Sequence, residues 1–533
     1  MKKRKLSLLL TLLTCLMGTN VYAYDIKVDN DDGIPIYYNL INDGTELEVT
    51  YLVDPKYFIA EGDNSFTYRG DLNIPETVTY MGMTRKVTAI GEYAFFRCVS
   101  LTSLTIPSSV SFIGENAFSE SKLGSVHISS LEAWCKIQFN GSSSNPVSRS
   151  GSLYLNGEEV SNLVIPNGIT AINSYAFYNF RRIVSVTIPN SVKSIGSWAF
   201  CACSNLTSII IPNSVISIGD SAFRNIRNLK SITIPSSVTY IGESPFAYCV
   251  NLTSIEVESD NKAYDSRDNC NAIIETSTNK LLAGCKNTVI PSTVMSIGSY
   301  AFAYCSGFSS LNIPQGVTSI GRYAFYGCSF SYATIPNGMK SIGSNAFCSC
   351  NFLKSIDIPN SMVSIGDSAF YNCKNLASMT IGSSVNYIGL RAFEYCDALT
   401  TIISRMVEPC DLYNDFTPNV YSNATLYVPR GSLEAYWSKN YWNKFRNIKE
   451  GDPNDPNGIA NVESLPVLVP GEGGTLQVSG VRQGSPIYVY DISGRLVSYA
   501  QASSDITTVR TTLRSGDVGI VKIGGKTVKV VMR

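Results

Sequence analysis

One six-residue pattern recurs along most of this chain and constrains its fold more than any other feature. Ile-Gly-x-x-Ala-Phe occurs in nine verbatim copies and two near-copies. Its phenylalanines are 23 residues apart, except for one separation of 22 and two long gaps of 59 and 56. A fixed period of about 20–50 residues is typical of solenoids, in which each repeat is one coil stacked on the next. The phenylalanines are Phe95, Phe118, Phe177, Phe200, Phe223, Phe246, Phe302, Phe325, Phe347, Phe370 and Phe393.

The repeat Leu206–Asn228 shows how the apolar residues fit one coil. Its sequence, LTSIIIPNSVISIGDSAFRNIRN, predicts an inward-facing strand that ends at Pro212, a second short extended piece, and a tight turn that begins at Ala222. Gly219 suits the sharp change of direction before the turn. The two residues between glycine and alanine vary from copy to copy, whereas a catalytic motif would keep its polar positions. We therefore interpret the pattern as structural.

A single repeat of this kind cannot fold alone. Its seven apolar side chains gain roughly 10–20 kcal/mol on burial, at ~1.5–3 kcal/mol each. Ordering its 23 residues costs roughly 1–2 kcal/mol per residue. Stacking supplies the missing burial and pairs the strand edges at about 4.8 Å per coil. The repeats are thus expected to form one continuous array.

The full consensus, LxxIxIPxxVxxIGxxAFxxCxx, resembles the BspA-like leucine-rich repeat of surface and secreted proteins from host-associated bacteria. The resemblance covers roughly Ile74–Ile402. It implies a right-handed solenoid with one parallel sheet and short helical or irregular turns opposite. The expected fold is therefore an α/β-type repeat solenoid, mostly β, with a 23-residue period over 74–402.

The two long gaps and the flanking segments predict how the array is interrupted and closed. Insertions at about 129–165 and 258–289 are long enough for enlarged or irregular coils that rejoin the stack. Residues 24–73 contain alternating segments and are expected to form an N-terminal β cap. Residues 403–450 are expected to form the C-terminal cap, with a strand, a turn and a short amphipathic helix in Ala424–Glu450. Caps are needed because an exposed parallel edge invites aggregation.

The chain begins with a segment typical of a signal peptide. Lys2, Lys3, Arg4 and Lys5 precede an apolar run that ends in small residues before Ala23. We predict cleavage after Ala23, so that residues 1–23 are removed. A second interpretation is a lipoprotein leader with Cys15 as the modified residue, although Thr14 stands where that box usually has Gly, Ala or Ser. No later stretch is long and apolar enough to predict a membrane-spanning helix.

The C-terminal part is predicted to be a linker, 451–464, followed by a small β-sandwich, 465–533, with a hairpin signal at Gly524-Gly525. The sandwich resembles the sorting domain that carries Gram-negative proteins through type IX secretion, in which VYDxxGR and a basic, β-branched last strand recur. This chain has VYDISGR at Val489–Arg495. It departs from the pattern at Asp517-Val518-Gly519, where the family usually has an aromatic residue. The alternative is a β-sandwich accessory domain without a sorting role.

Composition excludes several classes of function. The chain has 42 basic and 42 acidic residues, and removal of 1–23 leaves 38 against 42, which does not favour nucleic-acid binding. Its single histidine, His127, has no nucleophile nearby in a recognisable setting, and P-loop, GxSxG and HExxH motifs are absent. Asp29–Gly33 and Asp265–Asn269 lack calcium-loop spacing and are interpreted as solvated turns. We expect no enzymatic activity, no cofactor and no metal.

The chain contains 15 cysteines, most of which occupy a repeat position. Stacked on successive coils, they predict a buried column of small apolar thiols. Neighbours about 5 Å apart are within disulfide reach, so pairing within the column stays open, and Cys270 with Cys285 is a further weak disulfide candidate. Zinc binding by the two CxC sequences is disfavoured because they have no partner pairs. The column residues are Cys98, Cys203, Cys249, Cys305, Cys328, Cys350, Cys373 and Cys396.

Two surface features remain as candidates for binding. Small hydroxyl side chains occupy the outward strand positions, as in Thr207-Ser208 and Ser309-Ser310, and predict a broad face of low charge. Aromatic residues occupy the position just before the repeat alanine and should align on successive coils, either as a partner-binding row or as lids over the edge of the core. The aromatic residues at this position are Tyr93, Tyr175, Trp198, Tyr300 and Tyr323.

These observations favour an exported, non-enzymatic leucine-rich repeat protein that binds macromolecules through an extended solenoid face. The family resemblance implies adhesion to host proteins or to other cells. The alternative is a structural or glycan-associated envelope protein without a host protein ligand. The expected partner is an extracellular protein or cell-surface glycan, and the expected protein is a monomer outside a Gram-negative cell or on its outer membrane.

Overall fold

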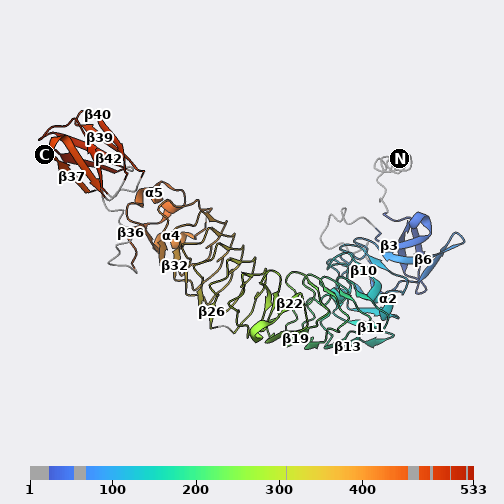
Figure 1. The fold of residues 1–533 in the computed structure, drawn as a ribbon. Coiled ribbons are helices and arrows are strands. Elements are labelled where there is room, and N and C mark those ends of the chain that lie inside the picture. The colour runs from blue at the N-terminus through green and yellow to red at the C-terminus, as the bar shows by residue number, and fades with distance from the viewer. Residues whose placement is uncertain are drawn as a thin grey trace, which may run out of the picture. The chain divides into compact units, whose positions relative to one another are not determined.

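The computed structural model describes residues 23–52, 68–307, 309–413, 415–453, 467–479, 484–503, 506–523 and 526–532. The chain forms two compact units, Met1–Glu450 and Gly451–Arg533. All but the last residue of the predicted signal peptide, together with Cys15 and most of the predicted linker, lies outside the described residues. In the first unit, coils are stacked side by side from the cyan to the orange part of the ribbon (Figure 1). The predicted repeat solenoid is therefore confirmed.

Each coil begins with a short strand, and most of these strands pair in parallel with the same strand of a neighbouring coil. We name this set of strands the first ladder, and it is divided into four separate sheets. Ser185 lies opposite Ser208, and Val186 lies opposite Ile209, so the register equals the 23-residue period. The first ladder consists of β4 (Gly70–Asn73), β7 (Leu101–Thr105), β9 (Ser125–Ile128), β11 (Leu153–Leu155), β13 (Asn162–Val164), β15 (Ser185–Thr187), β17 (Ser208–Ile209), β19 (Ser231–Ile234), β21 (Ser254–Val257), β26 (Ser310–Asn312), β28 (Tyr332–Thr334), β30 (Ser355–Asp357), β32 (Ser378–Ile381) and β34 (Thr401–Ser404).

The second extended piece of each coil also pairs in parallel, which adds a second ladder to the one sheet that the resemblance implies. Its strands are mostly two residues long, and Ile195 lies opposite Ile218. The buried isoleucines of this ladder face the same core as the first ladder. The second ladder consists of β6 (Met83–Ile90), β8 (Phe112–Ile113), β10 (Gln138–Phe139), β14 (Ala171–Ile172), β16 (Ser194–Ile195), β18 (Ser217–Ile218), β20 (Tyr240–Ile241), β25 (Ser296–Ile297), β27 (Ser319–Ile320), β29 (Ser341–Ile342), β31 (Ser364–Ile365) and β33 (Tyr387–Ile388).

A third set of hydrogen bonds joins the turns that follow the second ladder. The amides of Tyr175 and Phe177 donate to carbonyls 22 residues further on, those of Ser197 and Ala199, at 3.0 and 2.9 Å. Other coils repeat the arrangement, always with the donor on the N-terminal coil of the pair. We name this one-way set the turn ladder. Beneath it the buried pattern phenylalanines stack, with neighbouring ring centroids 5.0–5.9 Å apart where both rings belong to adjacent coils.

The repeat glycine has a different purpose from the one expected. Gly219 does not adopt a left-handed backbone, so the change of direction does not require glycine. Instead, a Cβ at this position would lie 2.5 Å from the backbone nitrogen of Ser197 on the preceding coil. Glycine is needed because the two backbones approach too closely for any side chain.

The first insertion forms an enlarged coil, after which new sheets begin at β13 and β14. The strand β10 extends the second ladder next to β8, and β11 extends the first ladder next to β9. Ser130 caps the first helix by accepting a hydrogen bond from the amide of Ala133 at 3.1 Å. The further elements of this insertion are α2 (Leu131–Lys136), α3 (Val147–Ser150) and β12 (Glu158–Glu159).

The second insertion interrupts both ladders with an antiparallel meander, whereas the sequence indicated only an irregular or enlarged coil. Its last strand then pairs in parallel with β25 and restarts the second ladder. Where the ladder stops, the Tyr264 hydroxyl accepts the hydrogen bond of the Ile241 amide at 2.9 Å, in place of a strand carbonyl. The meander consists of β22 (Tyr264–Asp265), η3 (Arg267–Asn269), β23 (Ala272–Glu275) and β24 (Lys280–Gly284).

Short elements close both ends of the solenoid. At the N-terminal end β3 pairs in parallel with β6, so antiparallel strands cover the open edge of the second ladder. At the C-terminal end β35 and β36 continue the first ladder. The N-terminal elements are β1 (Ile26–Asp29), β2 (Pro35–Ile41), η1 (Asn42–Gly44), β3 (Glu46–Thr50) and β5 (Thr77–Tyr80). The C-terminal elements are α4 (Pro418–Asn423), β35 (Thr425–Val428), α5 (Leu433–Ser438), η4 (Trp442–Lys444) and β36 (Asn447–Glu450).

The second unit is a small β-sandwich, as predicted. Two antiparallel sheets share one core, to which Val478 contributes from one sheet and Val489 from the other. The predicted hairpin residues Gly524 and Gly525 lie outside the described residues, between β42 and β43. The elements are β37 (Val467–Gly471), η5 (Glu472–Gly474), β38 (Thr475–Ser479), β39 (Pro486–Asp491), β40 (Leu496–Gln501), β41 (Ile506–Arg510), β42 (Val518–Ile523) and β43 (Lys526–Val531).

Candidate functional site: an aromatic surface on the turn side

The turn ladder carries four of the five predicted aromatic residues as two stacked pairs. The rings of Tyr175 and Trp198 lie 6.3 Å apart at 8°, and those of Tyr300 and Tyr323 lie 4.7 Å apart at 12°. All four side chains are half-buried. The predicted alignment on successive coils is therefore observed for these pairs.

The fifth predicted residue, Tyr93, lies apart from the others. Its ring contacts Phe96 at 5.6 Å in an edge-on arrangement, and its hydroxyl is 3.4 Å from the side-chain amide of Asn116. The next coil has Asn116 at the same repeat position, and the first insertion follows. The structure thus does not bring Tyr93 to the aromatic pairs.

Arg224 connects the two stacked pairs. The coils between them have Ser221 and Ser244 at the row position, which leaves space above the turn. The Arg224 guanidinium lies 5.5 Å from the ring centroid of Trp198 and 4.9 Å from that of Tyr300. One cation therefore links aromatic rings from both sides of the second insertion.

A second group of tyrosines widens this surface, and we did not predict it. The Tyr248 ring lies 4.5 Å from the Arg224 guanidinium and 4.8 Å from the Tyr304 ring. The sequence did contain a signal, because the tyrosines of this group follow the pattern phenylalanine by one or two residues in AFY and FAYC. We name the whole set the aromatic surface: Tyr175, Tyr178, Trp198, Arg224, Tyr248, Tyr300, Tyr304, Tyr323 and Tyr326.

The backbone under the row residues is left-handed. Trp198 has a φ of 61° and Tyr300 a φ of 57°. Bulky residues rarely adopt this conformation, whereas Asn tolerates it and occupies the same position at Asn116 and Asn345. Five coils therefore have an aromatic residue where the backbone favours a small polar one.

Partial burial raises the pKa of tyrosine hydroxyl groups on the aromatic surface. Burial raises the pKa of Tyr248, although Arg224 opposes the shift, and burial likewise raises the pKa of Tyr178. Both hydroxyls are therefore protonated at neutral pH and can donate or accept hydrogen bonds. Among the described residues, no carboxylate lies within 4.0 Å of the Arg224 guanidinium. The surface thus offers the positive charge of Arg224 and many phenol groups, and Arg322 adds a second guanidinium 4.9 Å from the Tyr323 ring.

The other predicted surface, the hydroxyl face of the first ladder, is exposed at Thr207, Ser208, Lys230, Ser231, Ser309, Ser310 and Lys354, with Ser355 half-buried. Several of its threonines bond to the preceding coil, as Thr207 Oγ1 does to the carbonyl of Val184 at 3.5 Å. These hydroxyls are partly occupied by the fold itself. His127 lies on the outward side of β9, where its ring stacks on Tyr154 at 4.8 Å.

The cysteine column is buried, and its thiols take part in polar contacts that the sequence did not indicate. Cys350 Sγ donates to the carbonyl of Phe325 on the preceding coil at 3.2 Å, and Cys203, Cys249, Cys328, Cys373 and Cys396 repeat this bond. Burial raises the pKa of Cys98 to about 12. All described cysteines are free thiols, so Cys270 and Cys285, the weak disulfide candidate, are not paired.

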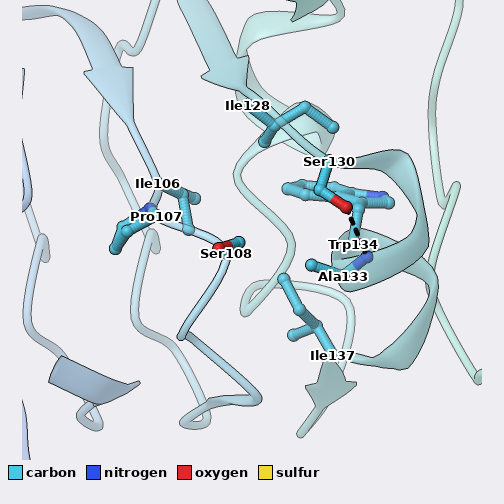
Figure 2. Close-up of a pocket in the computed structure, with 8 residues that line it drawn as sticks. All are labelled: Ile106, Pro107, Ser108, Ile128, Ser130, Ala133, Trp134 and Ile137. Atoms are coloured by element: carbon cyan, nitrogen blue, oxygen red, sulfur yellow. Dashed lines mark hydrogen bonds between the residues drawn. The ribbon is translucent and has the colours of Figure 1, made fainter. Parts of the chain in front are cut away.

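The remaining candidate sites offer little chemistry. Figure 2 shows a cavity between Pro107 and Trp134 of only about 10 Å³, which is room for about one water molecule. In the described part of the chain, no three His, Cys, Asp or Glu side chains cluster as metal ligands. Arg267 pairs with Asp265 at 2.6 Å in one of the two acidic turns. No helix among the described residues has the length and hydrophobicity needed to cross a membrane.

Comparison with known proteins identifies the repeat. The profile of the BspA type leucine rich repeat region matches residues 73–147, 148–272 and 274–400, in six copies. The chain belongs to the BspA-type leucine-rich repeat family. The resemblance stated from the consensus is thereby confirmed, and the fold of this BspA-type protein is that of a repeat scaffold.

Solved structures of bacterial leucine-rich repeat proteins are similar to this BspA-type chain. A leucine rich cell surface protein from Faecalibacterium prausnitzii A2-165 is 27% identical, with a TM-score of 0.54 over 71% of this chain and 95% of that one. The pneumococcal vaccine antigen PcpA is 18% identical, with a TM-score of 0.47 over 80% and 99%. A leucine-rich repeat protein from Bacteroides ovatus ATCC 8483 is 22% identical, with a TM-score of 0.35 over 80% and 100%. Among curated proteins, none matches the chain.

Proposed function

We propose that this BspA-type protein is an exported, non-enzymatic adhesin that binds an extracellular protein through the aromatic surface. Membership of the family supports a scaffold rather than a catalyst. The similar structure from Faecalibacterium prausnitzii is described as a cell surface protein, which supports a location outside the cell. The N-terminal sequence, with its basic residues and apolar run, supports export.

The observation that carries this proposal is the position of Arg224 among Trp198, Tyr248 and Tyr300. Tyr, Trp and Arg are the residues most enriched at the energetic centres of protein interfaces. Here they lie together on one surface, half-buried and fixed by mutual contacts, so that little side-chain entropy is lost when a partner binds. The guanidinium keeps unused hydrogen-bond donors that an acidic group of a partner could accept.

The left-handed backbone supports a role in binding rather than in packing alone. A bulky residue in this conformation costs roughly 1–2 kcal/mol, which the Asn found in other coils largely avoids. Stacking of an aromatic pair returns about 0.5–1.5 kcal/mol. The aromatic residues therefore bring little net stability, and function gives the better account of their presence.

Binding of the mature chain, 24–533, to immobilised extracellular-matrix proteins and to purified neutral glycans tests the proposal. We expect saturable binding to a protein. The double variant Trp198→Asn and Tyr300→Asn should weaken it at least tenfold while the melting temperature stays within a few degrees. Tyr240→Asn is the matched control, because Tyr240 is 56% exposed on the second ladder, away from the turn side. Equal binding by the double variant, or retention on glycans alone, would contradict the proposal.

We further propose that the second unit directs this BspA-type protein through type IX secretion to the surface of a Gram-negative cell. The sequence VYDISGR and the basic last strand support this role. The test compares surface delivery of the full chain with that of a chain ending at Glu450, which retains the first compact unit. Delivery of both forms in equal amount would show that the second unit has another role.

A further inference from the structure

A polar pocket lies where the first insertion meets the following coil. Its volume is about 310 Å³, at the lower end of the range of roughly 300–1,000 Å³ for small-ligand sites. Three arginines line it, Arg149 from α3 and Arg181 and Arg182 from the turn after Phe180. Serine, asparagine and glycine supply the rest of the lining, and no aromatic or aliphatic residue contributes. Such a lining suits a charged, strongly hydrated ligand rather than an apolar one.

Hydrogen bonds hold the two walls of the pocket together and orient one arginine. Arg181 Nε donates to Asn179 Oδ1 at 3.0 Å, and Asn179 Nδ2 donates to the carbonyl of Ser148 in α3 at 2.8 Å. Arg149 Nη2 is 3.3 Å from Ser143 Oγ. Each of these two guanidiniums uses only part of its five donors, so several N–H groups remain for a ligand.

The positive charge of the pocket is poorly compensated. Arg182 lies 3.7 Å from Glu159, whose carboxylate also accepts a hydrogen bond from Ser152 Oγ at 3.0 Å. Within the described ranges, no carboxylate lies within 4.0 Å of Arg149 or Arg181. Three cations therefore share one carboxylate in a chain whose total charge is near zero. Three adjacent cations repel one another, and an anion would relieve that repulsion.

We propose that this pocket binds an acidic saccharide, a sugar unit that carries a sulfate or carboxylate group. Guanidinium groups bind such oxyanions through paired, charge-assisted hydrogen bonds. The side-chain amide of Asn205 lines the pocket and is available for sugar hydroxyl groups, whereas the Ser150 hydroxyl already donates to the Ser152 carbonyl at 3.0 Å. An acidic peptide fits less well, because peptide recognition relies on buried aromatic or aliphatic anchors that this pocket lacks. The proposal shares with the proposed function only the requirement that the chain works outside the cell.

The pocket and the aromatic surface are neighbours but use different residues. Arg149 and Arg224 both oppose the rise that burial causes in the pKa of Tyr178, so each guanidinium lies near that residue. Because the two sites share no residue, a variant of one site leaves every residue of the other site in place. Loss of saccharide binding with intact protein binding, or the reverse, shows which of the two proposals fails.

Titration calorimetry of the mature chain with a sulfated disaccharide, its desulfated counterpart and tetraglutamate tests the pocket. We expect the sulfated disaccharide to bind at one site, with an affinity that falls as salt concentration rises. The double variant Arg149→Gln and Arg181→Gln should lose at least tenfold in affinity. Glu159→Gln should increase the affinity, because it removes the competing carboxylate.

The repeat supplies a closely matched control. Arg227 Nε donates to Asn225 Oδ1 at 3.1 Å, which is the bond of Arg181 to Asn179 repeated two coils later and outside the pocket. Arg227→Gln should leave binding unchanged. The proposal is wrong if the double variant binds as the wild type does, if the desulfated sugar binds equally well, or if tetraglutamate binds more tightly than the sulfated disaccharide.

Discussion

The carboxylate of Asp415 accepts a hydrogen bond from the backbone amide of Ala392, with 2.9 Å between the nitrogen and Oδ1. Phe416 continues the column of stacked phenylalanines at 5.4 Å from Phe393, so Asp415 occupies the position of the repeat alanine after the last pattern coil. Its other oxygen accepts from the amide of Tyr413 at 2.7 Å. The carboxylate therefore lies at the end of the turn ladder, toward which the amides of that ladder point.

This relationship predicts a pH-dependent stability. Burial raises the pKa of Asp415 to about 6 from an ordinary 3.8, although the amides of Tyr413, Ala392 and Arg391 oppose the shift. The folded state binds the proton of Asp415 more tightly than the unfolded state does, so protonation of this carboxyl group stabilises the fold. This contribution to the free energy of unfolding is complete below about pH 4 and is lost as the pH rises through about 6. The loss amounts to about 3 kcal/mol.

Asp415→Asn should therefore stabilise the C-terminal coils at pH 8 by about 1–2 kcal/mol. It removes the buried charge but keeps one carbonyl acceptor, and the lost second acceptor costs about 1 kcal/mol. Denaturant unfolding at pH 4 and pH 8 measures the effect, and the gain should vanish at pH 4. Asp220→Asn is the control, because Asp220 accepts an amide of the next coil at 2.8 Å but is exposed. A gain that is equal at both pH values would rule out this explanation.

The close approach of coils predicts that the repeat glycine cannot be replaced. Gly219→Ala places a methyl group 2.5 Å from the Ser197 nitrogen, and the backbone has to move. We expect a loss of about 1–3 kcal/mol in the free energy of unfolding. Asn213→Ala, at an exposed position of the same coil, should change it by less than about 0.5 kcal/mol. Equal effects of the two substitutions would show that the coils can separate freely.

The phenylalanine column predicts a large effect of truncation. Phe223 is fully buried and stacks on Phe200 and Phe246 at 5.9 and 5.5 Å. Phe223→Ala should cost about 3–5 kcal/mol, as measured by denaturant or thermal unfolding. Phe352→Ala should cost little, because Phe352 is 58% exposed. An unchanged melting curve for Phe223→Ala would contradict the assigned packing.

The buried thiols predict low reactivity in the folded protein. Burial raises the pKa of Cys203, Cys350 and Cys373, so the reactive thiolate is scarce, and every described cysteine except Cys410 is buried. A disulfide reagent should therefore modify the native mature chain at Cys410 at most, and all 14 of its thiols after denaturation. Rapid modification of several thiols in the native state would show that the coils open easily.

The period alone predicted the solenoid, because a repeat that cannot bury its apolar residues has to stack on its copies. Physical details that depend on the distance between coils did not follow from it. The reason for Gly219 became visible only with the neighbouring backbone of Ser197 in place. The thiol of Cys350 was expected to be an apolar filler, but it donates to Phe325, and no spacing in the sequence reveals that contact.

The candidate site was predicted only in part, because some of its contacts depend on how separate coils meet. Tyr175, Trp198, Tyr300 and Tyr323 share a repeat position, so their alignment could be predicted, but Tyr93 has no aromatic neighbour in the row on the next coil. The bridge formed by Arg224 spans coils whose row positions are serines, and it crosses the second insertion. Counting residues cannot show that an insertion leaves the turn side continuous.

The one-way turn ladder makes the solenoid directional, because the backbone amides of each coil donate to carbonyls of the following coil. Each coil therefore has the same donors for the next coil and the same acceptors for the preceding one, so the loss or duplication of one whole period would leave the hydrogen bonds between the remaining coils unchanged. A solenoid joined in this way can differ in length by whole periods without a change in the contacts between the remaining coils.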